Sequence, residues 1–118
     1  MKASALFARI GARCFEPAAD PDIAAAFTSD LLSDVMGNAP EESVLITIQA
    51  HATTVAVSLV ADIRAILLCT SREAPPDMLA AAAKEGVAVY GTAMHQFDAS
   101  VAVHAALGLP PPSLAPAP

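Results

Sequence analysis

The stretch FTSDLLSDVMGNAPEESVLITIQAHAT, residues 27–53, decides which fold the chain is expected to adopt. Its clearest part is VLITI at residues 44–48, an unbroken run of β-branched residues and leucine. Such a run is typical of a strand that is buried on both faces, as the strands of parallel sheets are. Polar residues follow it at once, beginning with Gln49 and His51. The stretch therefore predicts a buried strand that ends in a polar corner.

The segment before this strand, residues 29–36, predicts a short helix. Thr28 or Ser29 is expected to cap it, because a hydroxyl there accepts a hydrogen bond from an unpaired N–H of the first turn. Gly37 is expected to end it in the left-handed conformation. One side of this helix is apolar, with Leu31, Leu32, Val35 and Met36, and the other is polar, with Asp30, Ser33 and Asp34. The polar side is either a solvated helix surface or one wall of a cleft.

Three strand–helix units are expected after residue 43, since buried strands alternate there with helical segments. The expected strands are residues 44–48, 65–69 and 87–90, and the expected helices are residues 54–61, 75–84 and 97–107. Right-handed crossovers make such strands parallel, so their carboxyl ends gather at one edge of the sheet. The sequence thus predicts a single three-layer α/β domain with a mostly parallel sheet and helices on both faces.

The remaining segments complete the predicted organisation. The expected elements before residue 27 are a helix at residues 4–11, a strand at 13–15, a loop at 16–22 and a strand at 23–27. One domain is expected to span residues 1–109. The tail PPPSLAPAP, residues 110–118, is proline-rich and is expected to be extended or disordered.

Composition and charge restrict the classes of partner. The chain has 118 residues and a formal net charge of −6, and its Lys and Arg residues form no cluster. These features argue against nucleic acid or an anionic membrane as the main partner. Arg9 and Arg13 interrupt the N-terminal apolar residues, so no signal peptide is expected. Residues 44–61 carry no formal charge, but the polar side chains at their centre argue against a membrane span. A cytoplasmic location is expected.

Two cysteines and one histidine are expected inside the apolar interior. Cys14 and Cys69 lie in apolar segments, which predicts reduced, buried thiols. An iron–sulfur cluster normally takes four cysteine ligands, so two cysteines cannot hold one within a monomer, and no cofactor is expected. His104 shares a helical stripe with Phe97 and Val101 and is expected to pack partly buried beside them.

Polar residues follow each of the three predicted parallel strands, and open α/β sheets bind ligands at this carboxyl edge. Helix N-termini beside the same edge favour anions. These corners, together with the polar side of the helix at residues 29–36, supply the candidate ligand-binding residues. They are Asp30, Ser33, Asp34, Gln49, His51, Thr53, Thr70, Ser71, Arg72, Thr92 and His95. A small anionic ligand is the expected partner of this edge.

Two of these candidates have alternative explanations. Arg72 carries a forked cation suited to phosphate, but a surface ion pair with Glu73 or Asp77 also accounts for it. His51 is either a histidine that hydrogen-bonds local backbone or a ligand for a phosphate or a base.

Metal and nucleophile chemistry have weak support. His51 and His95 with Asp30 or Asp34 lack a tight ligand spacing such as HExxH, so no metal site is expected. Ser33 lacks a GxSxG elbow, so no catalytic triad is expected around it.

The strings SDLLSDVM at residues 29–36 and LITIQAH at residues 45–51, followed by VAV, resemble the DRTGG domain family. The resemblance covers about residues 23–109. The same fold is similar to the N-terminal domain of HPr kinase/phosphorylase and, more distantly, to the N-terminal domain of MurF-type ligases. The resemblance implies a regulatory domain with a mixed sheet, homodimeric and of unassigned ligand. Stand-alone members are often encoded near iron-only hydrogenase subunits, which implies a link to a redox enzyme.

The chain departs from this family in one corner. The family takes its name from a glycine-rich corner after a central strand, whereas this chain has Thr70, Ser71, Arg72 and Glu73 there. The glycine pair that would permit close backbone approach is therefore missing. The chain also carries no P-loop, and the kinase activity of HPr kinase belongs to a separate domain, so that activity is not expected here.

Three functions compete. The leading expectation is a non-catalytic regulatory module that binds a nucleotide or another phosphate-bearing small molecule as a homodimer. The second is a protein-interaction adaptor for a redox enzyme complex, which predicts an exposed apolar patch and no cleft. The third is a hydrolase or phosphotransferase, which requires a general base within reach of a bound substrate.

Overall fold

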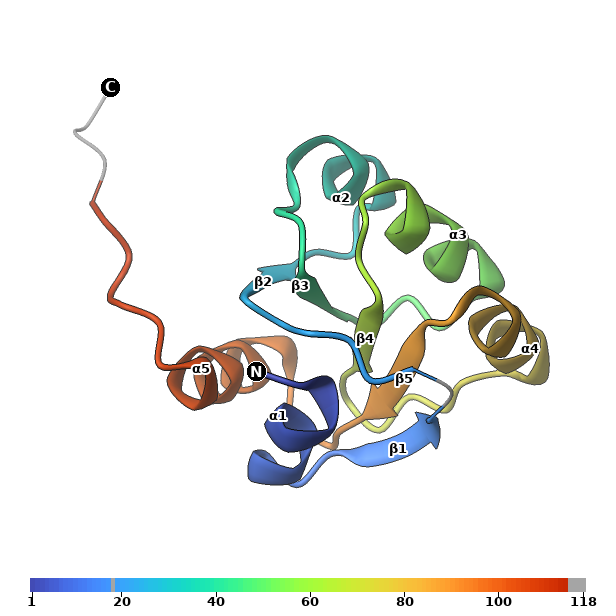
Figure 1. Ribbon diagram of the computed structural model, residues 1–118, viewed down its shortest axis with the longest axis horizontal. Coiled ribbons are helices and arrows are strands. Elements are labelled where there is room, and N and C mark those ends of the chain that lie inside the picture. Colours follow the sequence, from blue (N-terminus) through green and yellow to red (C-terminus); the bar gives the residue numbers. More distant parts are fainter. Residues whose placement is uncertain (18, 115–118) are drawn as a thin grey trace.

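The computed structural model describes residues 1–17 and 19–114, and five strands within them form one sheet (Figure 1). The strands are β1 (Arg13–Glu16), β2 (Ala25–Thr28), β3 (Ser43–Thr47), β4 (Ala65–Leu68) and β5 (Ala88–Gly91). Their order across the sheet is β1-β5-β4-β3-β2. Strands β2 to β5 run parallel, whereas β1 pairs antiparallel with β5 at one edge. The predicted mixed, mostly parallel sheet is confirmed.

Helices cover both faces of this sheet. They are α1 (Ala3–Arg9), α2 (Leu32–Asn38), α3 (Ala52–Val60), α4 (Pro76–Glu85) and α5 (Gln96–Leu107). Helices α1 and α5 lie on one face, and α2, α3 and α4 lie on the other (Figure 1). The predicted three-layer α/β architecture is therefore confirmed.

Strands β3 and β4 are buried along their whole length because both of their faces meet helices. Val44 and Ile46 belong to the core beneath α1 and α5, whereas Leu45 belongs to the core beneath α2, α3 and α4. Successive side chains of a strand point to opposite faces, so this alternation is expected of a strand between two helical layers. In the core beneath α1 and α5, Phe7 stacks on Tyr90 with ring centroids 4.0 Å apart.

The register of the parallel strands brings their carboxyl ends to one edge of the sheet. Thr28 pairs with Ile46, Thr47 with Leu68, and Leu68 with Gly91. The residues that follow these strands therefore share that edge, as the sequence predicted. Strand β1 is antiparallel to β5, so it begins where β5 ends, and Arg13 pairs with Gly91 there.

Helix α2 begins later than predicted. The sequence placed a helix at residues 29–36, capped by Thr28 or Ser29, but α2 starts at Leu32 and no side chain caps it. The Ser29 hydroxyl instead accepts a hydrogen bond from the Leu31 N–H at 3.1 Å. This bond closes a local turn one step before the helix, because Asp30 is held by the end of β3.

The end of α2 also differs from the prediction. Gly37 was expected to stop the helix in the left-handed conformation, but it lies inside α2 and its φ is not positive. The helix ends before Ala39, whose backbone is extended. Pro40 follows, and a proline disfavours the helical conformation of the residue before it. Proline, rather than glycine, therefore explains this helix end.

The apolar residues of the segment 29–36 are not all covered. Val35 is buried, whereas Leu31 is 65% exposed and Met36 is 48% exposed. Cys69 is buried as predicted, whereas Cys14 is exposed because it lies on the edge strand β1.

The apolar stripe of α5 faces outward. His104 is partly buried, as predicted, but Phe97 is 78% exposed and Val101 is 56% exposed, so the stripe that they share with His104 is not packed against the core. Ala99 and Val103 form the buried side of α5 instead. The His104 ring lies 2.9 Å from the carbonyl oxygen of Pro110, at the point where the chain leaves the helix.

The C-terminal residues carry no regular structure as far as they are described. Residues 110–114 form no helix or strand, and residues 115–118 of the predicted tail lie outside the described residues. The division into a domain at residues 1–109 and a tail at residues 110–118 stays a prediction. Among the described residues no helix is both long enough and apolar enough to cross a membrane.

Candidate functional site

The corner after β4 has an unusual backbone. Thr70 and Ser71 have φ angles of 57° and 56°, although neither is glycine. The Arg72 N–H donates to the Cys69 carbonyl at 3.3 Å, so these two residues are the centre of a tight turn. Two positive φ angles at the centre are the signature of a type I′ turn, which favours glycine and asparagine. The corner that lacks the glycine pair thus adopts a conformation that glycines would make easier.

Backbone hydrogen bonds fix this corner to the loop after β5. The Thr70 N–H donates to the carbonyl of Met94 and the Ser71 N–H donates to the carbonyl of Thr92, each at 2.9 Å. The Thr92 N–H in turn donates to Leu68 at 2.9 Å. These bonds hold the left-handed backbone in place, and they also occupy N–H groups that a phosphate would otherwise meet.

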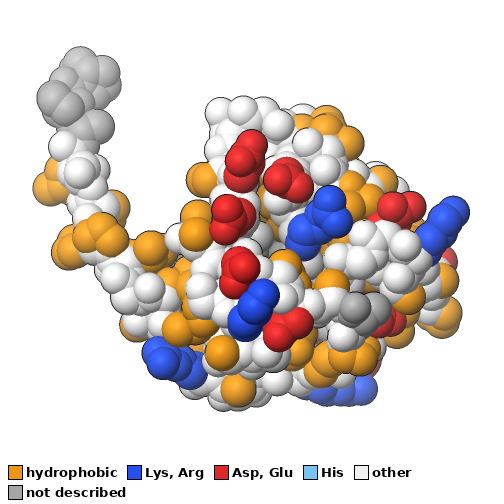
Figure 2. All heavy atoms as spheres, in the orientation of Figure 1, with side chains coloured by type: hydrophobic (Ala, Val, Ile, Leu, Met, Phe, Trp, Pro, Cys, Tyr) orange, Lys and Arg blue, Asp and Glu red, His pale blue; other side chains and the backbone are white. Residues whose placement is uncertain are grey.

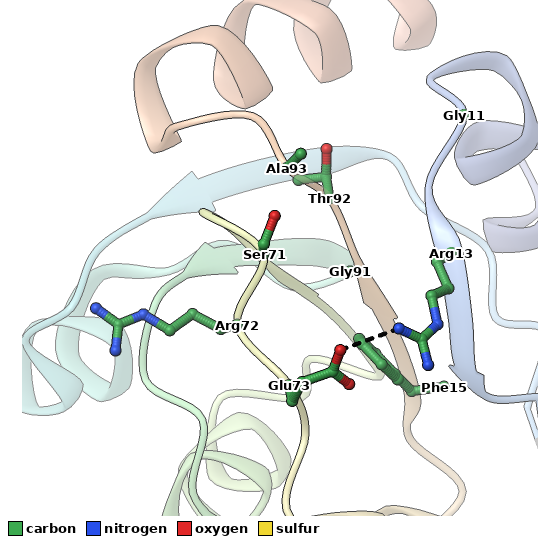
Figure 3. A pocket seen from close by; sticks show the side chains of 9 residues that line it. All are labelled: Gly11, Arg13, Phe15, Ser71, Arg72, Glu73, Gly91, Thr92 and Ala93. Carbon is green, nitrogen blue, oxygen red and sulfur yellow. Dashed lines mark hydrogen bonds and ion pairs between the residues drawn. The ribbon is translucent and has the colours of Figure 1, made fainter.

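A pocket of about 260 Å³ opens beside this corner (Figure 3). It lies where the carboxyl ends of β4 and β5 meet the start of β1. Its lining residues are Gly11, Arg13, Phe15, Ser71, Arg72, Glu73, Gly91, Thr92 and Ala93. The pocket is called the edge pocket below. It includes three of the eleven predicted ligand-binding residues, namely Ser71, Arg72 and Thr92.

Arg13 lines the edge pocket and contacts two other residues of its lining. Its Nη1 lies 3.1 Å from Oε1 of Glu73, and its guanidinium carbon lies 4.7 Å from the centre of the Phe15 ring. Arg13 and Phe15 are two residues apart on β1, and this contact places both side chains on the same face of the strand. The Phe15 ring in turn lies against Gly91, where a Cβ atom would approach it to 2.3 Å. A glycine at this position therefore makes room for the ring beneath Arg13.

Arg72 behaves differently from the prediction. The expected ion pair with Glu73 or Asp77 is wrong, because Glu73 pairs with Arg13 instead. Figure 3 shows the Arg72 side chain directed away from the Arg13–Glu73 pair. Among the described residues it makes no hydrogen bond or ion pair, so its guanidinium has its donors available beside the corner.

The edge pocket is positively charged within an acidic chain. Arg13 and Arg72 are two of the six Lys and Arg residues of the chain, and Glu73 is the one carboxylate in the lining, which gives a formal charge of +1. On the face that Figure 2 shows, the basic side chains lie apart from one another among acidic and apolar ones. A second pocket of about 240 Å³ at the amino ends of β3 and β4 has the opposite balance, with Asp22, Glu42 and Asp62 against Arg64. Anions therefore favour the edge pocket.

A second polar cluster surrounds Asp30, between the end of β3 and the start of α5. One oxygen of Asp30, Oδ1, accepts hydrogen bonds from Thr47 Oγ1 at 3.0 Å, from the Ile48 N–H at 3.0 Å and from Gln96 Nε2 at 2.9 Å. The Gln49 side-chain amide donates to the Asp30 carbonyl at 3.0 Å. These hydrogen bonds connect the ends of β2 and β3 to the start of α5. Because Oδ1 of Asp30 already accepts three of them, the cluster has a structural role.

The Asp30 cluster also affects the thiol behind it. Burial, together with the smaller effect of the nearby negative charge of Asp30, raises the pKa of Cys69 to about 11. Cys69 is fully buried, so its thiol stays protonated and unreactive near neutral pH.

The other predicted ligand-binding residues are not brought together. His51 and His95 are the N-cap residues of α3 and α5, are exposed, and make no side-chain hydrogen bond among the described residues. Ser33 and Thr53 are exposed, and Asp34 accepts a hydrogen bond from Asn38 along α2 at 2.6 Å. His51, Arg72 and His95 nevertheless follow β3, β4 and β5, so the predicted common edge is confirmed for these three positions.

Sequence reasoning missed Arg13 and Phe15 as pocket residues. Their place depends on the antiparallel pairing of β1 with β5, which joins segments far apart in the chain. The one local signal is the alternation of Arg13 and Phe15, which predicts a shared face of a strand. Gln96 was also missed, although it adjoins the predicted residue His95.

Neither the fold nor the two clusters point to a metal centre. Within residues 1–17 and 19–114 no group of three or more His, Cys, Asp or Glu residues is placed so that it could hold a metal ion. Comparison with known protein families finds no family that matches the chain, and comparison with curated proteins finds no match either. The resemblance to the DRTGG domain therefore stays a prediction from the sequence.

Proposed function

We propose that the protein is a non-catalytic regulatory module of the DRTGG type that binds a small phosphate-bearing molecule in the edge pocket. The observation that carries the proposal is the placement of Arg13 and Arg72 around one pocket in a chain of net charge −6. Guanidinium groups form strong, directional hydrogen bonds with phosphate oxygens. The hydroxyls of Ser71 and Thr92 point outward at the same mouth and add neutral donors (Figure 3).

The size of the edge pocket narrows the class of ligand. Its volume of about 260 Å³ lies below the roughly 300–1,000 Å³ of pockets that enclose drug-sized ligands. The pocket therefore suits inorganic phosphate, or the phosphate end of a larger molecule such as a nucleotide whose remaining part extends into solvent.

A non-catalytic role is supported by the positions of the titratable groups. General acid–base catalysis needs a titratable side chain within hydrogen-bonding reach of the reacting atoms. Neither His51 nor His95 lines the edge pocket, and in the described part of the chain no histidine hydrogen-bonds a serine, a cysteine or a carboxylate. The carboxylate in the lining, Glu73, is engaged by Arg13.

The proposal is tested by measuring how the melting temperature responds to inorganic phosphate and to nucleotides at constant ionic strength. We expect an upward shift for the wild-type chain, because a ligand that binds only the folded state stabilises it. Arg13→Gln should abolish the shift. Arg64→Gln is the matched control, since Arg64 also has one carboxylate partner, Asp62 at 3.8 Å, but lies at the opposite edge of the sheet. No shift with any phosphate compound, or equal loss of the shift in both variants, would reject the proposal.

A second candidate function, protein-interaction adaptor, is favoured by a specific apolar surface. Gln96 Nε2 bonds Asp30, and the residues that follow each of them, Phe97 and Leu31, are 78% and 65% exposed. Val101, one turn further along α5, is 56% exposed. Exposed large apolar side chains on adjoining segments are typical of interaction surfaces. This surface suits either a redox enzyme partner or a second copy of the chain in a homodimer.

The adaptor candidate is distinguished by light scattering of the purified protein. If a homodimer forms through this surface, the double variant Phe97→Ser/Val101→Ser should be monomeric. Val60→Ser is the control, since Val60 is 72% exposed on α3. A wild-type chain that is monomeric at all concentrations would remove the homodimer and leave the surface to another protein.

A further inference from the structure

We propose that Glu73 is a built-in counterion of Arg13, and that a phosphate-bearing ligand binds by exchanging with the Glu73 carboxylate. This inference rests on the proposed function of the edge pocket. It specifies the position at which the phosphate binds and the residue that sets its affinity. The Arg13–Glu73 distance of 3.1 Å means that a carboxylate oxygen already occupies the anion position on the guanidinium.

The pair is easy to open. The side chains of Arg13 and Glu73 are 67% and 71% exposed, so solvent and ions reach both partners. Ion pairs of such exposure contribute little to stability and are screened by salt. A phosphate dianion carries more charge than a carboxylate and presents more acceptor oxygens, so it competes effectively for the same guanidinium.

The exchange needs only a side-chain movement. Glu73 directly follows the turn at Thr70 and Ser71, and the N–H groups of these two residues donate to carbonyls of the loop after β5. The backbone therefore stays in place when the Glu73 side chain turns away. Side-chain rotation at the surface is fast and requires no rearrangement of the fold.

Arg13 stays in position when Glu73 leaves. Its guanidinium lies 4.7 Å from the centre of the Phe15 ring, and a cation over an aromatic face is attracted to it. The Phe15 ring is supported by Gly91 behind it. The site thus keeps a pre-oriented cation, and the negative charge of Glu73 next to it weakens the binding of any anion that replaces it.

The test is the dissociation constant of inorganic phosphate, measured by calorimetry at constant ionic strength. Glu73→Gln should tighten phosphate binding about five-fold, because it removes a competing charge of modest strength. Asp62→Asn is the matched control, since Asp62 is the carboxylate partner of Arg64 at the other edge and its substitution should leave the constant within about two-fold of wild type. Circular dichroism checks that each variant is folded.

A spectroscopic readout separates exchange from a simple change of charge. In the wild-type chain the carboxyl carbon resonance of Glu73 should shift during a phosphate titration, whereas that of Asp62 should not. If phosphate binds the wild-type chain and Arg13→Gln abolishes it, but Glu73→Gln does not tighten binding or the Glu73 resonance does not move, the exchange is refuted and the proposed function stands. If neither the wild-type chain nor Glu73→Gln binds phosphate, the proposed function fails as well.

Discussion

Asp30 holds together three segments that are distant in the sequence. Its Oδ1 accepts hydrogen bonds from Thr47, Ile48 and Gln96, so Asp30→Ala would leave three donors without this partner. We expect a loss of about 2 kcal/mol in the free energy of unfolding, measured by urea denaturation. Asp34→Ala is the matched control, because within the described part of the chain the Asp34 carboxylate bonds Asn38 alone, on its own helix, and its loss should cost less than about 0.5 kcal/mol. Equal costs for the two variants would contradict this view of Asp30.

The Cys69 thiol should make stability depend on alkaline pH. Burial, with the charge of Asp30, raises its pKa to about 11 in the folded state, whereas an unfolded thiol titrates near 9. The unfolded chain therefore loses this proton first as the pH rises. The contribution of Cys69 is fully present below about pH 9 and is lost as the pH rises toward 11, by about 2 kcal/mol in total.

Urea denaturation between pH 8 and pH 11 measures this dependence. Cys69→Ala should flatten the fall in stability within this window, whereas Cys14→Ser, at an exposed position, should leave it unchanged. A fall of the same slope in Cys69→Ala and wild type would assign the pH dependence to other groups.

At the scale of the elements, two glycines have opposite roles. Gly91 ends β5 with the Phe15 ring against it, and an added Cβ would lie 2.3 Å from that ring. Gly91→Ala should therefore lower the free energy of unfolding by about 1–3 kcal/mol. Gly37 lies inside α2 with no atom within 4 Å of an added Cβ, so Gly37→Ala should raise stability by about 0.5–1 kcal/mol.

A double-variant cycle gives the physical reason for the Gly91 effect. If the ring causes the clash, Gly91→Ala should cost little in a Phe15→Ala background, since the space is then free. Chemical denaturation of the four chains measures this coupling. A cost that is the same in both backgrounds would mean that backbone strain, and not Phe15, is responsible.

The elements also show what the sequence could and could not predict. The runs at β3, β4 and β5 were predictable because burial on both faces leaves continuous apolar segments. The start of α2 was not, because Asp30 has a better set of partners at the end of β3 than in a first helical turn. Local capping rules do not include such tertiary hydrogen bonds.

The candidate site was predictable only where its residues follow the parallel strands. Ser71, Arg72 and Thr92 follow parallel strands, and right-handed crossovers bring such positions to one edge. Arg13 and Phe15 reach that edge only through the antiparallel pairing of β1, and a four-residue strand carries no signal that names its partner. The partner of Glu73 was missed with them.

At the scale of the whole molecule, the strand order predicts which backbone amides exchange slowest with solvent. Strand β4 is the middle strand of the five, and all its residues are buried. Its amides open only with the whole domain, so hydrogen exchange should be slowest there. Strand β1 lies at an edge, is irregular between Cys14 and Glu16, and should exchange much faster. Equal protection of β1 and β4 would contradict this arrangement.

Strand β2 is the edge strand on the side of the sheet opposite to β1, and the same exchange experiment tests whether a second chain pairs with it. The N–H groups of Ala25 and Ser29 donate to Glu42 and Ile46 across the sheet. In a parallel pair the intervening amides at Ala26 and Thr28 point to the free edge. They should therefore exchange rapidly in a monomer and become protected, with increasing protein concentration, if two chains pair through β2. Mass spectrometry or NMR at two concentrations makes this measurement. Light scattering shows whether the protein is dimeric at the higher concentration. If it is dimeric and both amides still exchange rapidly, the interface does not involve the β2 backbone, and side-chain contacts such as those of α5 become the favoured explanation.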